Sequence, residues 1–351
     1  MNKFICGAVI LAGFVLACAA VAAGYLFSDL AGYAKTAAGG GSGLAAPWER
    51  IVVLPAGKGF SGVVKNLVKG GVVQDPRRFR RLARVLGVDR RMKAGEYRFS
   101  SAMSPLEILG KLARGDVLLH GLTIPEGWTV REIAVLAGKK GIGDARDLLS
   151  QALSPEYAAG RGVGGGTLEG YLFPDTYYFP RNTPADRILQ TMLARFEEVF
   201  LPSWAERARG LNLSRHQLVT LASIIEKETG AAEERPIISS VFHNRLKRGM
   251  KLQSDPTVIY GIPDFDGNIT RRHLDTPTPY NTYQIGGLPP GPIASPGKAS
   301  LEAALFPRET AFLYFVARGD GTHHFSASLE EHNEAVRRYQ LGESKIGESN
   351  Q

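Results

Sequence analysis

Two glutamates, Glu226 and Glu228, stand near the end of an apolar segment, residues 218–229, whose sequence is LVTLASIIEKET. At the helical period its apolar side chains cover a broad arc, which predicts a largely buried helix. These side chains are Leu218, Val219, Leu221, Ala222, Ile224 and Ile225. Glu226 falls inside that arc. Because burial penalises the charged form of a carboxylic acid, we expect a raised pKa for Glu226, which suits a general acid.

Glu228 lies two positions further on, so it should project from the opposite flank of the helix and should not share one substrate bond with Glu226. Ser214 and Gln217 form a capping-box pattern that starts the helix, and we expect it to end at Gly230. The alternative is purely structural. In that case Glu226 is the buried partner of an arginine, such as Arg235 or Arg245.

The N-terminal region contains an uncharged stretch, residues 4–27, that is long enough to cross a bilayer as a helix. Lys3 precedes it, which favours a cytoplasmic tail and places the rest of the chain outside the cytoplasm, at the inner membrane. A cleaved signal peptide is the alternative. Both cysteines, Cys6 and Cys18, lie in this stretch, so the remainder has no disulfide and no cysteine metal ligand.

The chain divides into five predicted parts of an α+β protein. Residues 1–28 form a cytoplasmic tip and membrane anchor, and residues 29–47, rich in Gly and Ala, form a flexible linker. Residues 48–120 form a small unit in the order β-α-α-β, with strands at 51–54 and 95–99 and helices at 60–69 and 76–86. Residues 121–342 form a larger mixed α/β domain. Residues 343–351 form a polar tail.

A basic run in the small unit supplies much of the net charge of +8. Its members are Arg77, Arg78, Arg80, Arg81, Arg84, Arg90, Arg91 and Lys93. Such a run binds anionic polymers or lipids, or it is simply a solvated helix face. We expect no nucleic acid partner, because the chain is predicted to lie outside the cytoplasm and only Phe79 interrupts the run with an aromatic ring.

Several polar and aromatic residues of the larger domain are candidates for substrate binding. Glu169 and Tyr171 follow a glycine-rich stretch, which is typical of a cleft wall that stacks on sugar rings or of a turn feeding a buried edge strand. Of the others, Asn244 flanks the apolar face of a predicted helix, and the rest lie around loops and turns, where binding groups usually gather. The rest are Gln253, Asp255, Tyr280, Asn281 and Tyr283. The seven histidines include no H-E-x-x-H pair, so we expect neither a metal nor a cofactor.

A series of motifs in one order resembles the endolytic murein transglycosylase family, the YceG-like proteins. The motifs are TIPEG at 123–127, LEGYLFPDTY at 168–177, LASIIEKET at 221–229, VFHNRLKRGMKLQSDPTVIYG at 241–261, YNTYQIGGLPPGPIASPG at 280–297 and YFVARGDGTHHF at 314–325. The resemblance covers nearly everything after Trp48. It implies a YceG-like catalytic domain, a LysM-like small unit, a single membrane anchor, and Glu226 as the catalytic residue.

The resemblance also implies a substrate, peptidoglycan glycan strands, and partners, the cell-wall synthases of the membrane. A lytic transglycosylase cuts between N-acetylmuramic acid and N-acetylglucosamine with one carboxyl group, which acts as acid and then as base. Two other functions stay open. The chain could be a muramidase-type hydrolase that pairs Glu226 with Glu169 or Asp255. It could also be a wall-binding scaffold without catalysis.

Overall fold

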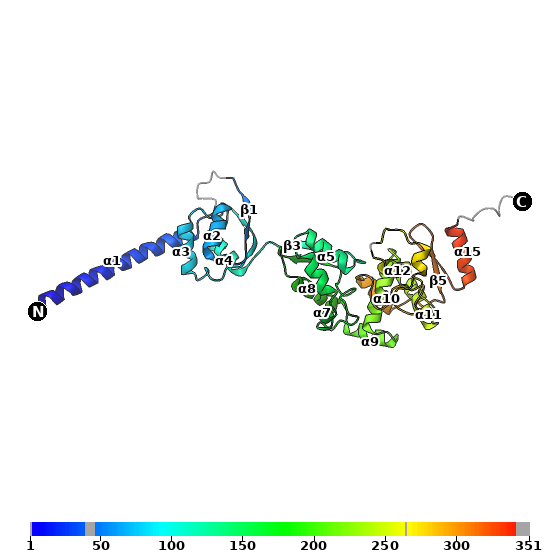
Figure 1. The fold of residues 1–351 in the computed structure, drawn as a ribbon. Helices are drawn as coiled ribbons and strands as arrows, with labels where there is room; N and C mark the ends of the chain where they lie inside the picture. The colour runs from blue at the N-terminus through cyan, green and yellow to red at the C-terminus, as the bar shows by residue number, and fades with distance from the viewer. Residues whose placement is uncertain (1, 39–45, 264, 342–351) are drawn as a thin grey trace. The chain divides into compact units, whose positions relative to one another are not determined.

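The computed structural model describes residues 2–38, 46–263 and 265–341. The chain forms two compact units, one ending at His120 and the other beginning at Gly121 (Figure 1). Within the described residues, six short strands form three separate two-stranded sheets, and helices make up most of the remainder. The fold is therefore mixed α and β, as expected, but it has no central sheet in these ranges.

The small unit has the predicted β-α-α-β order. Strand β1 (Glu49–Leu54) pairs antiparallel with β2 (Gly95–Ser100), and α2 (Phe60–Lys69) and α3 (Pro76–Val85) lie between them in sequence. Helix α4 (Pro105–Arg114) follows and begins with a Ser104 and Glu107 capping box. The side chains that fill the core include Val64, Leu67, Phe79, Tyr97, Phe99 and Leu109.

The N-terminal helix α1 (Asn2–Ala34) contains one candidate membrane span, Phe14–Ala34. The helix continues six residues beyond the expected boundary at residue 28. Its end packs on the small unit, where Ala34 and Ala38 join the core and Asp29 pairs with Arg78 at 2.6 Å. The start of the predicted linker, residues 29–38, is therefore ordered, because apolar contacts fix it there. Residues 39–45 of that linker and the predicted tail 343–351 lie outside the described residues.

The second unit begins with β3 (His120–Thr123), which pairs with β4 (Thr176–Phe179), and it closes with the hairpin β5 (Tyr314–Ala317) and β6 (His323–Ser326). Helices supply most of what lies between. They are α5 (Val130–Lys139), α6 (Ala145–Ala152), α7 (Pro155–Ala159), α8 (Ala185–Val199), α9 (Pro202–Gly210), α10 (Arg215–Glu228), α11 (Arg235–Lys247), α12 (Asp255–Tyr260), α13 (Arg271–Asp275) and α14 (Lys298–Leu305), with α15 (Leu329–Tyr339) after the hairpin.

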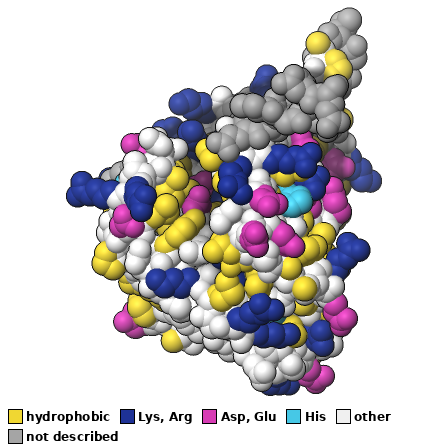
Figure 2. Space-filling model, turned by 90° about the vertical axis from the view of Figure 1, so that its right-hand side faces the viewer, with side chains coloured by type: hydrophobic (Ala, Val, Ile, Leu, Met, Phe, Trp, Pro, Cys, Tyr) yellow, Lys and Arg dark blue, Asp and Glu magenta, His cyan; other side chains and the backbone are white. Residues whose placement is uncertain are grey.

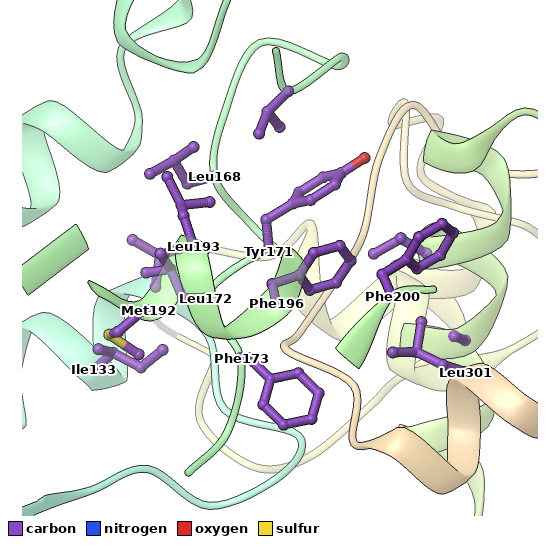
Figure 3. Packing of buried hydrophobic residues seen from close by; sticks show 14 of the residues in the cluster. Ile133, Leu168, Tyr171, Leu172, Phe173, Met192, Leu193, Phe196, Phe200 and Leu301 are labelled. Carbon is purple, nitrogen blue, oxygen red and sulfur yellow. The ribbon is translucent and has the colours of Figure 1, made fainter. Parts of the chain in front are cut away.

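The core of the second unit is built around α10, which contacts α9, α11, α12 and α14. Figure 3 shows part of it, where Tyr171 packs on Phe196, and Phe196 stacks on Phe200. Tyr171 is only 2% exposed. The segment 171–179 therefore follows the second of the two interpretations, a turn that feeds a buried strand, and not a cleft wall that stacks on sugars.

Basic and acidic side chains are interspersed on the face of the molecule shown in Figure 2, and apolar side chains are exposed between them. The described side chains on this face therefore form no extended surface of one sign. The predicted basic run lies elsewhere, in the small unit, where Arg77, Arg81 and Arg84 of α3 are exposed while Phe79 and Leu82 are buried.

We predict that Ala38→Asp will detach the end of α1 from the small unit. Ala38 is 9% exposed, and its backbone N–H donates to the Met103 carbonyl at 2.8 Å. A polar group buried there without a partner should cost about 2 kcal/mol. Limited proteolysis of the full chain in detergent should then show faster cleavage before β1. The neighbouring Ala37 is exposed, so Ala37→Asp is the matched control, and equal cleavage of both variants would contradict the prediction.

Candidate active site

Helix α10 carries its two glutamates at its C-terminal end, after a run of buried residues. The Ser214 Oγ accepts the Gln217 N–H at 3.1 Å, and the Gln217 side chain accepts the Ser214 N–H at 2.9 Å, so the predicted capping box is present. Every residue from 218 to 225 is buried. The helix ends at Glu228, before the expected Gly230, because Thr229 takes an extended backbone conformation and leaves no place for a left-handed glycine cap.

The Glu226 side chain is enclosed by fixed polar groups. It is 6% exposed, its Oε2 accepts the N–H of Gly297 at 2.9 Å, and its Oε1 lies 3.6 Å from a terminal nitrogen of Arg235. The arginine partner that the sequence left open is therefore Arg235, at the start of α11, and not Arg245. These two contacts fix the direction in which the carboxylate points.

Two loops are tied to the end of α10 through backbone groups. The Gly127 N–H donates to the Ser295 carbonyl, and the Ser295 N–H donates to the Trp128 carbonyl, both at 2.8 Å. The Lys227 ammonium donates to the Gly127 carbonyl at 3.2 Å. Three segments that are far apart in the sequence thus meet at Glu226. Their hydrogen bonds fix the positions of the three segments relative to one another.

Glu126 is the residue of this site that we did not expect. Its carboxylate lies against Gly297, where an added Cβ would stand 1.8 Å from the Glu126 Oε1. Burial and, after it, the charge of Glu226 raise the pKa of Glu126, while Arg235 lowers it. The only sequence signal was its place in the TIPEG motif. The sequence of that motif predicts a turn, and no neighbouring residue indicates which helix the turn contacts.

A small cavity of about 240 Å³ opens at this junction. It brings together three carboxylates and two cations from the loop before α5, the end of α10 and the start of α11. The lining residues are Glu126, Gly127, Glu226, Lys227, Glu228, Thr229, Gly230 and Arg235. Such a cavity can supply a proton, an accepting carboxylate and fixed positive charge to one bond of a bound substrate.

Glu228 also borders a second cavity, of about 420 Å³. Its side chain is partly buried on the flank of α10 that faces this second cavity. Its carboxylate accepts a hydrogen bond from the Ser254 hydroxyl. Burial raises the pKa of Glu228 to about 7, Asp255 adds to this, and Ser254 and Arg245 oppose it. The turn before α12 covers this flank of α10, which the helical pattern alone does not show.

Three of the predicted substrate-binding residues line this second cavity. Gln253 accepts from the Arg245 guanidinium at 3.3 Å, and the Tyr283 hydroxyl donates to Asp255 at 2.7 Å. Gln253 has a φ of 51°, a left-handed conformation that is uncommon for a residue with a side chain. Backbone strain of this kind is found most often at functional sites.

The other predicted binding residues do not border either cavity. Asn281 is fully buried and donates to the carbonyls of His273, Leu274 and Thr276, while Asn244 donates to those of Thr310 and Phe312. The Tyr171 hydroxyl meets a ring nitrogen of His216 at 3.0 Å, and Tyr280 packs on Tyr260. The polar groups of Asn281, Asn244 and Tyr171 therefore bind other parts of the chain in this structure.

Glu169 is another buried carboxyl group outside the cavities. It is 3% exposed and accepts the Val130 N–H at 3.0 Å and the Tyr260 hydroxyl at 3.1 Å. Burial raises the pKa of Glu169 to about 7, and these two hydrogen bonds limit the rise. No group of three or more potential metal ligands occurs among the residues that the structure describes.

Comparison with known proteins gives a consistent result. The model of the YceG-like family matches residues 52–338. The chain is 32% identical over 303 residues to the endolytic murein transglycosylase of Bacillus subtilis (strain 168), covering 82% of this chain and 83% of that one. It is 31% identical to the protein of that name in Streptococcus pneumoniae serotype 2, across 81% of this chain and 57% of the longer relative.

A solved structure is similar as well. A crystal structure of a putative YceG-like protein from Listeria monocytogenes matches with a TM-score of 0.58 and 33% sequence identity. The match covers 83% of this chain and all of that one.

We predict that Glu169→Gln will stabilise the protein above pH 7 and have little effect at pH 4. The folded-state pKa of Glu169, about 7, lies above the value of 4.5 for a free carboxyl group, so this group favours folding at low pH and ceases to do so as the pH rises through that interval. At about 1.4 kcal/mol per unit, the gain at pH 8 should reach roughly 3 kcal/mol. Denaturant unfolding at both pH values measures it, and a gain of equal size at pH 4 would contradict the assignment.

Proposed function

Because this chain belongs to the YceG-like family, we propose that it is a lytic murein transglycosylase that cuts glycan strands internally, between N-acetylmuramic acid and N-acetylglucosamine. The observation that carries the proposal is the enclosed carboxylate of Glu226. It borders a cavity and is oriented by the Gly297 N–H and Arg235. Peptidoglycan glycan strands are the substrate, and no cofactor takes part.

The reaction needs one group that gives a proton and then takes one. Glu226 protonates the oxygen between the two sugars, and the bond from that oxygen to C1 of the muramic acid breaks. The C6 hydroxyl of the same muramic acid then bonds to C1, and its proton passes to the Glu226 carboxylate. The product is a 1,6-anhydro end, and no water is consumed. Arg235 and the Gly297 N–H stabilise the carboxylate that exists between the two steps.

A muramidase-type hydrolase is the second candidate, since a hydrolase needs a second carboxylate near the first. Neither Glu169 nor Asp255 borders the small cavity. Glu126 does, and it lies on the same glycine that binds Glu226. This neighbour is the observation that keeps hydrolysis as an alternative.

We also propose that α1 is a retained membrane anchor and that the two folded units lie outside the cytoplasm. The end of α1 supports this, because Ala34 and Ala38 belong to the core of the small unit and would not be dispensable parts of a leader. The small unit, with its β-α-α-β order, is proposed to be LysM-like. Cell-wall synthases in the same membrane are the proposed protein partners.

Glu226→Gln should lower the rate of glycan cleavage by about 10²–10⁴-fold, because it keeps the shape of the side chain but removes the transferable proton. Glu228→Gln should lower the rate much less, because the Glu228 carboxylate accepts a hydrogen bond from the Ser254 hydroxyl and borders the second cavity. Turnover of purified peptidoglycan measures both variants, and circular dichroism checks their folding. A larger loss of rate in Glu228→Gln than in Glu226→Gln would show that Glu228 is the general acid.

Products formed in heavy-oxygen water separate the two candidate reactions. In a transglycosylase the nucleophile comes from the substrate, so mass spectrometry should show unlabelled muramyl ends that are lighter by one water than hydrolysed ends. Reducing ends that carry the label would show a hydrolase, and Glu126 would then be the second carboxylate to replace.

The anchor and its orientation predict that protease added to spheroplasts will digest the bulk of the protein and leave a short fragment that contains α1. Disrupting the membrane should expose little further protein. Full protection in intact spheroplasts would show the opposite orientation.

A further inference from the structure

The surroundings of Glu226 pose a problem for a general acid. Arg235 and the Gly297 N–H both interact more favourably with a carboxylate than with a protonated carboxyl group. These contacts help the second half of the proposed reaction, in which Glu226 has lost its proton. They oppose the first half, in which it must hold one. The site therefore needs a further group that offsets the positive charge.

Glu126 is placed to be that group. Gly297 gives its N–H to Glu226, and the Glu126 carboxylate packs on the same residue so closely that a Cβ would stand 1.8 Å from Oε1 and 2.1 Å from Cδ. Hydrogen bonds of the neighbouring residue hold the Glu126 backbone in place. Gly127, its neighbour, is bound to the Ser295 carbonyl on one side and to the Lys227 ammonium on the other.

The other charged groups near the two carboxylates have partners of their own. Lys227 donates to the Gly127 carbonyl, and Glu228 accepts from Ser254. Lys298, next to Gly297, is exposed and lies 3.5 Å from Glu302. Arg235 is different. It is 12% exposed, and its Nε is buried without a hydrogen-bond partner, so its charge is free to act on both carboxylates.

We propose that Glu126 is a positioning residue for catalysis: its negative charge offsets Arg235, so that Glu226 keeps the proton it must donate. This inference rests on the proposed function, because it takes Glu226 to be the acid. Arg235 balances the charge of one carboxylate, and because each carboxylate penalises the charge of the other, the pair favours a state that holds one proton. When Glu226 gives up its proton, Arg235 and the Gly297 N–H then receive the new charge.

The consequence is a specific change in the pH dependence of turnover. Activity requires protonated Glu226, so the rate falls on the alkaline side of the profile as that proton is lost. Without the charge of Glu126, Arg235 stabilises the Glu226 carboxylate unopposed. The alkaline limb of Glu126→Gln should therefore move to lower pH by about one unit, the size of effect that a neighbouring charge commonly has.

Two variants and one control test this in the full-length protein with purified peptidoglycan. Glu126→Gln removes the charge and keeps the shape. Gly297→Ala keeps the charge and the N–H to Glu226, but its methyl group forces the Glu126 carboxylate out of place; the φ of −74° at Gly297 suits alanine. Both should shift the alkaline limb in the same direction. Glu206→Gln, an equal change of charge at an exposed residue of α9, should not shift it.

The outcomes separate this inference from the proposed function. If Glu226→Gln is inactive while Glu126→Gln loses rate equally at every pH, or loses none, Glu126 is not tuning the acid and the inference is overturned. If Glu226→Gln keeps full activity, the proposed acid is wrong and the inference falls with it. A shift in Glu126→Gln and Gly297→Ala, absent from Glu206→Gln, supports the inference.

Discussion

A carboxylate at the end of an apolar helix must find fixed groups to replace the water it loses, and this requirement organises the second unit. Residues 218–225 of α10 are buried, and the polar groups that contact Glu226 come from outside this helix. The replacements come from Gly297 and Arg235. To deliver them, the loop before α5, the loop before α14 and the start of α11 all converge on one helix end.

The same requirement explains why two carboxylates so close in sequence have different surroundings. Glu226 meets a backbone N–H and an arginine, whereas Glu228 is partly buried, accepts a hydrogen bond from a serine hydroxyl and lies near the charge of Asp255. Their cavities are lined by different loops, and only Glu228 borders both. The two carboxyl groups therefore have different hydrogen-bond donors although they lie two residues apart.

Features governed by nearby residues were predictable from the sequence. The capping box at Ser214, the β-α-α-β order and the buried face of α10 depend on a few neighbouring side chains. Glu126 could not be placed, because its partner is a glycine 171 positions further along the chain. Asn281 was ambiguous for another reason. An amide beside a loop suits a ligand and a backbone carbonyl equally well, and only the fold shows which one it has.

The continuous packing of α1 into the small unit has a mechanical consequence. A folded unit on a flexible linker can take many positions above a bilayer. A folded unit that packs on the end of a membrane helix tilts and rotates together with that helix. With α1 as the proposed anchor, the packing of Ala34 and Ala38 would keep the small unit from rotating freely about the helix end. The small unit would then stay at a constant distance from the membrane surface.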